Sequence, residues 1–473
     1  MRQMQKKIRL LPPIPILVVL LAFVSRFVVA CCIPLTGDEL LTLQSAVFIQ
    51  ETYCWPVFRL GQDYMLAIDD LFANMLLLFT SNKLIVIRLF PCVISSVGIG
   101  LLWTLLKNHT DRNRAELALL PFIIPSSTLW MYSASAVGTY ADCIFLIPII
   151  IYCTVYIENG TISSRFVGAV ILAIIGGVSL CVWRGLLFPL MLSLPFVLTN
   201  KQRRHARRII LDLLFNWPSC ILVLLLVAAT AGLSYRYLTR PATYSVQMSD
   251  LLLVGIALLC ATSLTWYKKT LLMQLSRIAL LPAGVVVGWL VIGKIVSVLF
   301  EFQKHNIYGS DTVLYHVGYS LRHFHEWWHA TELFFSRVVP ALWSGRIWLL
   351  EGGMVNTLNY TDTIVALVVG SLLFFSYIVM FSNLSPDYNK QVSNSPTNYI
   401  IIYSFIMMSL FLLPSHQNFG DYSYRYLVPF YPGILLLADN LVLLFRLAWL
   451  RAFFFTSLVL YNVIDLVLWV MQG

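Results

Sequence analysis

The stretch LLPPIPILVVLLAFVSRFVVACCIPLTGDE, residues 10–39, decides the fold class of this chain. It opens with an apolar run that ends at Cys32 and follows a strongly basic N-terminus, and it closes on two adjacent carboxylates, Asp38 and Glu39. A helix needs about 20 apolar residues to cross the hydrocarbon core of a bilayer. The run therefore predicts an uncleaved first membrane span rather than a signal peptide.

The composition of the whole chain agrees with a membrane protein. Of its 473 residues, 59% are hydrophobic and only 11% are charged, whereas soluble domains carry about 25% charged residues. The nine cysteines show no paired spacing, so we expect neither a disulfide framework nor a thiolate metal site. The formal net charge is +10, but the basic residues cluster in short gaps between apolar runs. This arrangement orients membrane proteins, and we expect no nucleic-acid partner.

The same length criterion predicts an all-α, polytopic membrane protein with about 11–13 transmembrane helices. A shorter apolar stretch at 71–80 predicts a half-buried helix. The predicted spans lie near residues 10–33, 84–106, 116–135, 140–157, 166–182, 185–199, 209–234, 249–266, 278–300, 362–382, 398–414, 426–445 and 451–470.

Charge then predicts the orientation of these spans. If the basic N-terminus is cytoplasmic, alternation leaves four further basic gaps on the same side, as the positive-inside rule requires. Those gaps are 107–114, 200–208, 267–277 and 446–451. The opposite, extracytoplasmic side receives the loops 34–83, 235–248, 301–361 and 415–425. They include the two longest loops and are rich in Asp, Glu, His, Trp and Tyr, so we expect function on that face.

Asp38 and Glu39 come directly after the first span, where a carboxylate is costly unless it is paired, hydrated or functional. One interpretation is helix capping, with Thr36 or Asp38 as the N-cap of a helix that starts near Glu39. The other is catalytic, because an acid at the bilayer surface can accept a proton from an incoming hydroxyl. The two roles are compatible.

The first loop continues as RLGQDYMLAIDDLFANMLLLF, residues 59–79, and supplies more polar candidates. Capping is again the alternative for the acidic pair at the start of the apolar run. We expect the polar residues of this loop to line a substrate pocket. They are Gln62, Asp63, Tyr64, Asp69 and Asp70.

These motifs carry a resemblance to a known family. GDELLTLQSA after the first span, then GQDYMLAIDD, then NKLIVIRLFPCVISSVGI with Arg88, and finally YRYLVPFYPGILLL from Tyr424 occur in this order. The order resembles the bacterial GT-C glycosyltransferases of the protein O-mannosyltransferase and lipid A aminoarabinose-transferase type. The matches cover about a fifth of the chain, at both ends. The middle of the chain matches nothing.

The resemblance implies a GT-C fold with extracytoplasmic juxtamembrane helices. Residues 1–300 would form the transmembrane core with 34–83 as catalytic loop, 301–361 an extracytoplasmic loop with amphipathic interfacial helices, and 362–473 the C-terminal helices. It places the enzyme in a bacterial inner membrane with its site facing the periplasm. The donor would be a sugar on a polyprenyl phosphate, and the acceptor a hydroxyl of a glycan, lipid or protein among membrane lipids.

The resemblance also implies roles for single residues. Asp38 matches the acidic position usually taken as catalytic, and Glu39 is its neighbour in the motif. Arg425, with Tyr424 beside it, would stabilise the departing phosphate, and Arg322 and Arg88 are weaker candidates for that contact. A snorkelling interfacial arginine is the alternative for Arg425. The chain has no Gly-rich nucleotide-binding motif, which suits a lipid-linked donor.

The segment His325-Glu326-Trp327-Trp328-His329 has the form H-E-x-x-H. It has three interpretations: an interfacial amphipathic helix, a set of substrate contacts by His325 and His329, or a zinc site. We expect no metal ligands here, although a divalent cofactor stays open. Three other functions stay open as well: an O-antigen ligase or polymerase-like transferase, a polyprenyl-lipid transporter and a membrane zinc metalloprotease.

Overall fold

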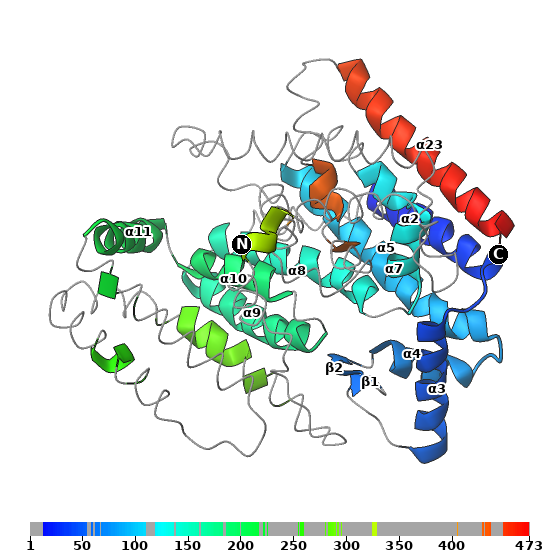
Figure 1. Ribbon diagram of the computed structural model, residues 1–473, viewed down its shortest axis with the longest axis horizontal. Helices are drawn as coiled ribbons and strands as arrows, with labels where there is room; N and C mark the ends of the chain where they lie inside the picture. The colour runs from blue at the N-terminus through cyan, green and yellow to red at the C-terminus, as the bar shows by residue number, and fades with distance from the viewer. Residues whose placement is uncertain are drawn as a thin grey trace, which may run out of the picture.

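Over the residues that it describes, the computed structural model is a bundle of helices with one small hairpin (Figure 1). It describes residues 13–53, 58–59, 62–66, 68–109, 119–136, 139–159, 162–182, 186–198, 200–216 and 448–472. It also describes short pieces at 221–222, 225, 254, 256–259, 280, 282–289, 291–292, 295, 324–328, 404, 428–429 and 431–436. Most of the expected 301–361 loop and 362–473 segment lies outside these residues.

The long helices of the described part account for most of the predicted spans in the first half of the chain. They are α2 (Pro13–Cys32), α5 (Lys83–His109), α8 (Tyr140–Asn159), α9 (Ile162–Val182) and the C-terminal α23 (Ala448–Gln472). Stretches of α2, α5, α8 and α23 are long and apolar enough to cross a membrane, namely Pro15–Cys32, Lys83–Lys107, Tyr140–Ile157 and Arg451–Leu468. The expected class, a helical polytopic membrane protein, is confirmed. The total number of spans stays a prediction.

Shorter elements complete the described part. They are α3 (Gly37–Thr52), the antiparallel strands β1 (Phe58–Arg59) and β2 (Gln62–Leu66), α4 (Ile68–Leu77), α7 (Ser127–Ala134), α10 (Leu187–Val197) and α11 (Asn200–Phe215). The predicted half-buried helix at 71–80 is thus confirmed as α4, beginning three residues earlier. The main hydrophobic core lies among α2, α5, α7, α8, α9 and α10, and residues of α23 belong to it. A smaller core lies where α3 and α4 meet the start of α5.

The predicted span 116–135 is not one helix. Residues 119–123 are helical, the chain breaks at 124–126, and α7 starts after it with Ser126 as N-cap. Pro125 lacks the N–H that a continuous helix needs, which explains the break. In a membrane the polar groups freed by such a break need partners inside the protein.

Four side chains supply those partners. Arg26 donates to the carbonyl oxygens of Phe122 (2.9 Å) and Ile123 (3.2 Å), and Ser25 also donates to Ile123 (2.7 Å). From α23, Asn462 donates to the carbonyls at 121 and 124 (3.0 and 2.8 Å), and Asp465 accepts the backbone N–H at 127 (2.7 Å). The buried charge of Arg26 therefore has a structural reason.

Two further spans differ from the prediction. The span expected at 185–199 contains α10, which has 11 residues and at 1.5 Å per residue is only about half as long as a bilayer core is thick. At the span expected at 209–234, the described helix α11 starts earlier than predicted, at Asn200, and includes the basic cluster. A helix needs only backbone hydrogen bonds to continue, so the step from charged to apolar sequence does not mark its start.

Hydrogen bonds and close contacts between helices show which helix ends share a face of the bundle. The start of α5 lies at the end of α2, because Arg88 donates to the Ile33 carbonyl (2.7 Å), whereas Gly100 faces Val19. The Thr139 hydroxyl donates to the Val182 carbonyl (2.8 Å), which joins the start of α8 to the end of α9. These ends form one face, and we call it the Asp38 face.

The opposite face carries the other ends of the same helices. The Arg165 guanidinium, at the start of α9, donates to the Leu198 carbonyl just after α10 (3.1 Å). The start of α11 follows directly, so α11 begins on the face opposite Asp38. In the view of Figure 1, α11 lies at the left beyond α9 and α10, and α3 lies at the right.

Close packing of α5 on α8 depends on Gly98. A Cβ atom at this position would lie 2.8 Å from the Ile144 carbonyl carbon and 2.8 Å from the Phe145 Cα atom. These are backbone atoms, so Gly98→Ala should push two core helices apart. We expect a loss of about 1–3 kcal/mol in the free energy of unfolding, as for other overpacked cores.

The measurement is the midpoint of thermal unfolding of the purified protein in detergent. Gly284→Ala is the matched control, because its added Cβ would meet nothing within 4 Å. Equal midpoints for the two variants would contradict the helix packing described here.

Candidate active site

The site is built where the chain leaves α2 and turns into α3. Thr36 is the N-cap of α3, and its side chain accepts the backbone N–H of Glu39 (3.4 Å). In return, the Oε2 atom of Glu39 accepts the Thr36 backbone N–H (2.9 Å) and its hydroxyl (3.1 Å). This reciprocal capping box confirms that Thr36, not Asp38, caps the helix.

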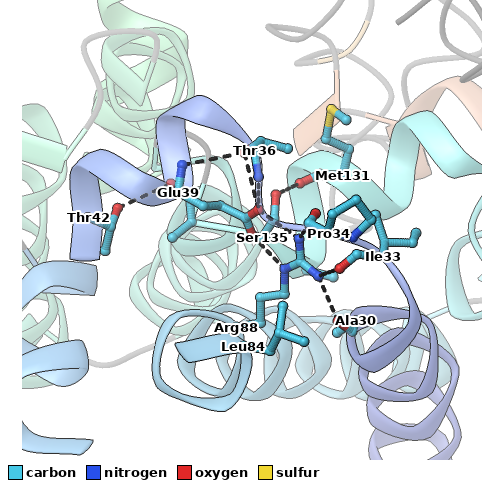
Figure 2. Close-up of polar contacts among 12 residues, drawn as sticks. Ala30, Ile33, Pro34, Thr36, Glu39, Thr42, Leu84, Arg88, Met131 and Ser135 are labelled. Atoms are coloured by element: carbon cyan, nitrogen blue, oxygen red, sulfur yellow. Dashed lines mark hydrogen bonds and ion pairs between the residues drawn. The ribbon is translucent and has the colours of Figure 1, made fainter. Parts of the chain in front are cut away.

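The Arg88 side chain of α5 hydrogen-bonds to both sides of this turn (Figure 2). Its Nε donates to Oε1 of Glu39 at 2.6 Å, and Nη2 donates to Oε2 at 2.8 Å. Nη1 donates to the carbonyls of Ala30 (2.6 Å) and Ile33 (2.7 Å), and Nη2 also donates to Pro34 (2.7 Å). Arginine has five N–H donors, so this guanidinium uses all of them.

The ion pair is removed from solvent. The Glu39 and Arg88 side chains are 0% and 1% exposed, and the guanidinium carbon lies 5.5 Å from the ring centre of Trp130. The indole N–H of Trp130 donates to the Arg26 carbonyl (2.8 Å), which holds the ring in place. A bidentate pair of this kind is strong and geometrically specific.

This geometry differs from two of the expected roles. Glu39 was expected to share the role of general base, but both of its oxygens accept bonds from the protein, so it is poorly placed to take a proton from a substrate. Arg88 was expected as a phosphate contact, but its donors are all engaged with Glu39 and the end of α2. The pair is suited to fixing the turn between α2 and α3.

Asp38 differs from its neighbour Glu39 in its exposure and in its polar partners. It lies in the first turn of α3 and is partly exposed. Among the described residues its carboxylate has no hydrogen-bond or ion-pair partner. As far as the described residues go, Asp38 is therefore a carboxylate with no polar partner, on a turn that Thr36, Glu39 and Arg88 hold by hydrogen bonds.

The other acidic candidates lie on α4. Asp69 and Asp70 form its first turn and are buried, at 7% and 0% exposed. Asn74 of the same helix donates to the Ala46 carbonyl (3.0 Å), which ties α4 to α3. Gln62, Asp63 and Tyr64 lie on strand β2 of the hairpin between these helices, and their side chains lie outside the described residues.

Contacts from α3 extend the site toward the start of α8. The Thr42 hydroxyl donates to the Ala136 carbonyl (3.5 Å) at the end of α7. A few residues on, Asp142 is buried in the first turn of α8. Asp142 and Thr139 are lone polar residues at the start of an apolar run, and Asn462 is a lone polar residue within one, so no sequence motif marks them.

The H-E-x-x-H segment is described only in part. Phe324–Glu326 form a 3₁₀ turn, and Nε2 of His325 lies 3.5 Å from Oε1 of Glu326. Trp327 and Trp328 are 45% and 76% exposed, as expected for an interfacial segment. Of the expected site residues, His329, Arg322, Tyr424 and Arg425 lie outside the described part. Within that part, no three His, Cys, Asp or Glu side chains gather as metal ligands would.

The helix that follows Arg425 is described in part. Tyr431 and the residues after it, 431–436, are helical and buried. The Tyr431 ring lies 5.8 Å from that of Phe122, between ring centres. The span predicted near 426–445 is thus helical at 431–436, and residues of this stretch belong to the main core.

Comparison with known proteins adds the following. No protein-family model matches the chain, and no curated protein matches it. It is similar in structure to the archaeal oligosaccharyltransferase AglB from Archaeoglobus fulgidus in complex with an inhibitory peptide and a dolichol-phosphate. The identity is 11% and the TM-score 0.45, over 96% of this chain and 54% of that one.

An apo-form Archaeoglobus fulgidus oligosaccharyltransferase is similar to the same degree, with 13% identity and a TM-score of 0.44, over 96% of this chain and 55% of that one. The chain thus spans about half the length of the solved chains it matches. Both are oligosaccharyltransferases by name. At these values the likeness identifies no family or substrate for this chain.

Proposed function

We propose that this chain is a GT-C-type membrane glycosyltransferase that moves one sugar from a polyprenyl-phosphate donor to a hydroxyl acceptor on the extracytoplasmic face. One observation carries the proposal. Asp38 is partly exposed and has no partner among the described residues, whereas the adjacent Glu39 is locked to Arg88 at 2.6 Å. Asp38 would then be available for chemistry, and the Glu39–Arg88 pair would hold the turn that carries it.

The chemistry at Asp38 would be general-base catalysis. The carboxylate takes the proton of the acceptor hydroxyl while the acceptor oxygen attacks C1 of the donor sugar. A new C1–O bond forms, the C1–O bond to phosphate breaks, and polyprenyl phosphate leaves with the bonding electron pair. The leaving group departs as an anion, so it needs positive charge nearby more than it needs a proton.

The Glu39–Arg88 pair would act on this reaction through geometry. It ties the last carbonyls of α2 to the first turn of α3, the turn that carries Asp38. A base displaced by 1 Å can lose a large part of its effect. We therefore assign Glu39 and Arg88 as positioning residues, and Asp38 as the catalytic residue.

Substrate and phosphate contacts complete the proposal. Arg425, with Tyr424, is assigned to the donor phosphate, and Arg322 is a further candidate. Gln62, Asp63 and Tyr64 of the hairpin are assigned to the substrate pocket. Asp69 and Asp70, which are buried in the first turn of α4, are assigned to the inner wall of that pocket. His325 and His329 remain candidates for acceptor contacts at the membrane surface.

The proposed function is tested by incubating purified full-length protein with a short-chain polyprenyl-phosphate sugar and a hydroxyl acceptor. Release of polyprenyl phosphate together with a glycosylated acceptor supports it. Activity only with a glycan on a lipid diphosphate would instead identify a ligase- or polymerase-like transferase. Loss of activity on zinc removal, with a peptide as substrate, would identify a protease.

Arg425 gives a prediction about the donor. Arg425→Ala should weaken donor use more than Arg425→Lys, because lysine keeps one positive charge although it loses the bidentate fork. The measurement is kcat/KM for the donor in detergent or proteoliposomes, and we expect about tenfold between the two variants, which corresponds to about 1.4 kcal/mol. Near-wild-type values for both variants would return Arg425 to the role of an interfacial arginine.

Membrane orientation gives a separate prediction. Glu51, near the end of α3, and His205, on α11, are both exposed and lie on opposite faces of the bundle. In a background without native cysteines, Glu51→Cys should react with a membrane-impermeant maleimide in intact cells. His205→Cys should react only after permeabilisation. The reverse pattern would place the site in the cytoplasm and contradict the positive-inside assignment.

A further inference from the structure

Helix α11 carries the strongest concentration of positive charge in the described part of the chain. Five of the eight residues 201–208 are Lys or Arg, and the first acid after them is Asp212. The helix continues unbroken from this basic half into the apolar half that ends at Phe215. The charge therefore sits on a regular, rigid element rather than in a loop.

The exposed side of α11 has a definite order along the helix. Arg204, Arg208, Leu211 and Phe215 follow one another at spacings of four, three and four residues, so they share one face. All four are exposed, with Leu211 at 39% and Phe215 at 84%. This stripe changes from guanidinium to apolar side chain within about three turns.

The other side of α11 is turned toward the protein. Ile209 is only 2% exposed and lies across the helix from the Arg204 stripe, at 100° per residue. Beyond α11, Ile221 and Leu225 are again exposed, at 39% and 46%. In sequence, the exposed apolar residues thus follow the arginines.

Exposed arginines followed by exposed apolar side chains suit the headgroup region of a membrane. Guanidinium groups bind phosphate oxygens, and apolar side chains one or two turns further on suit the acyl region just beneath the headgroups. Clusters of four to eight basic residues beside a membrane span, or on an amphipathic helix, are typical of anionic-lipid recognition. A nucleic-acid surface would not continue into exposed Leu and Phe.

We propose that α11 is a docking site for anionic phospholipid headgroups in the leaflet opposite Asp38. The Arg204 and Arg208 side chains would bind the lipid phosphates, with Leu211 and Phe215 in the acyl layer beneath them. This site is independent of the proposed transferase activity, because it rests only on α11 and on its place at the far face of the bundle. It would anchor the end of α10 and fix the tilt of the bundle.

The test uses the full-length chain in nanodiscs with a fluorophore at one site. Leu211→Cys, in a background without native cysteines, is labelled with bimane. The nanodiscs contain equal parts of phosphatidylglycerol and phosphatidylcholine, and in each of two samples only one of the lipids carries brominated acyl chains. We expect brominated phosphatidylglycerol to quench about twofold more than brominated phosphatidylcholine, because basic side chains enrich anionic lipid near them.

Controls separate headgroup recognition from general charge. Arg204→Gln with Arg208→Gln should abolish the preference, and 0.5 M salt should weaken it, since surface electrostatics are screened over about 4–5 Å at that concentration. Arg112→Gln with Arg114→Gln removes as many charges from another basic gap and should leave the preference unchanged. Equal quenching by both lipids, or a preference that survives the α11 substitutions, would overturn the proposal. So would a probe that neither lipid quenches, which would mean that protein covers α11.

Discussion

Replacing Asp38 by Asn should lower the rate of sugar transfer by a factor of about 10² to 10⁴, the usual effect of losing a general base. Asn has nearly the shape of Asp but cannot accept the proton from the acceptor hydroxyl. Asp38 makes no side-chain hydrogen bond or ion pair within the described residues, so the change should leave the fold unaltered. The measurement is the initial rate of polyprenyl phosphate release by purified protein with an unchanged thermal unfolding midpoint.

Glu39 cannot take over in that variant. Its two oxygens already accept bonds from Arg88 and Thr36 at 2.6–3.1 Å, and a proton on either oxygen would break part of this network. A residual rate close to wild type in Asp38→Asn would therefore show that the base lies elsewhere. Asp69 and Asp70 would then be the next carboxylates to test.

The H-E-x-x-H segment supplies the matched comparison. His325→Ala combined with His329→Ala should leave a substantial part of the transfer activity, because the proposed chemistry needs no metal-bound water. A zinc hydrolase would behave in the opposite way, since loss of two ligands releases the metal and its activated water. A dead double-histidine variant together with an active Asp38→Asn variant would reject the glycosyltransferase proposal.

The sequence predicted the positions of the described long helices well, because a membrane span is encoded by length and apolarity alone. The prediction of one span at 116–135 was wrong, because Pro125 breaks the helix. The side chains that bond the backbone groups freed by this break lie far away in the sequence. Arg26 and Asn462 satisfy the broken turn from α2 and α23. Such hydrogen bonds depend on tertiary structure, and no local sequence pattern predicts them.

The acidic pair shows the same limit inside the site. Sequence reasoning found Asp38 and Glu39 together and Arg88 separately, with capping and catalysis as compatible roles. In the structure Glu39 takes part in the capping box and in the ion pair with Arg88, whereas Asp38 is partly exposed and has no polar partner among the described residues. Adjacent residues on a helix face directions about 100° apart, so only the orientation of α3 decides which acid is open.

The second large effect is expected at the Glu39–Arg88 pair, and it is an effect on stability. Arg88→Met leaves the Glu39 carboxylate buried without its counter-ion and removes the donors to three carbonyls at the end of α2. Breaking a buried ion pair by removing one partner costs about 3–5 kcal/mol in the free energy of unfolding. We expect a large fall in the thermal midpoint and a low yield of monodisperse protein.

A double-mutant cycle makes this prediction specific. Glu39→Met with Arg88→Met removes both charges, so it should be less harmful than the sum of the two single changes, with a coupling energy of about 0.5–3 kcal/mol. It should not restore wild-type stability, because the carbonyls of Ala30, Ile33 and Pro34 still lose their donor. Arg88→Lys keeps the charge but lacks the guanidinium fork that reaches both carboxylate oxygens. Its thermal unfolding midpoint should lie between those of the wild type and Arg88→Met. If Arg88 instead bound the donor phosphate, Arg88→Met would keep its unfolding midpoint and lose only donor affinity, and that result would reverse the assignment made here.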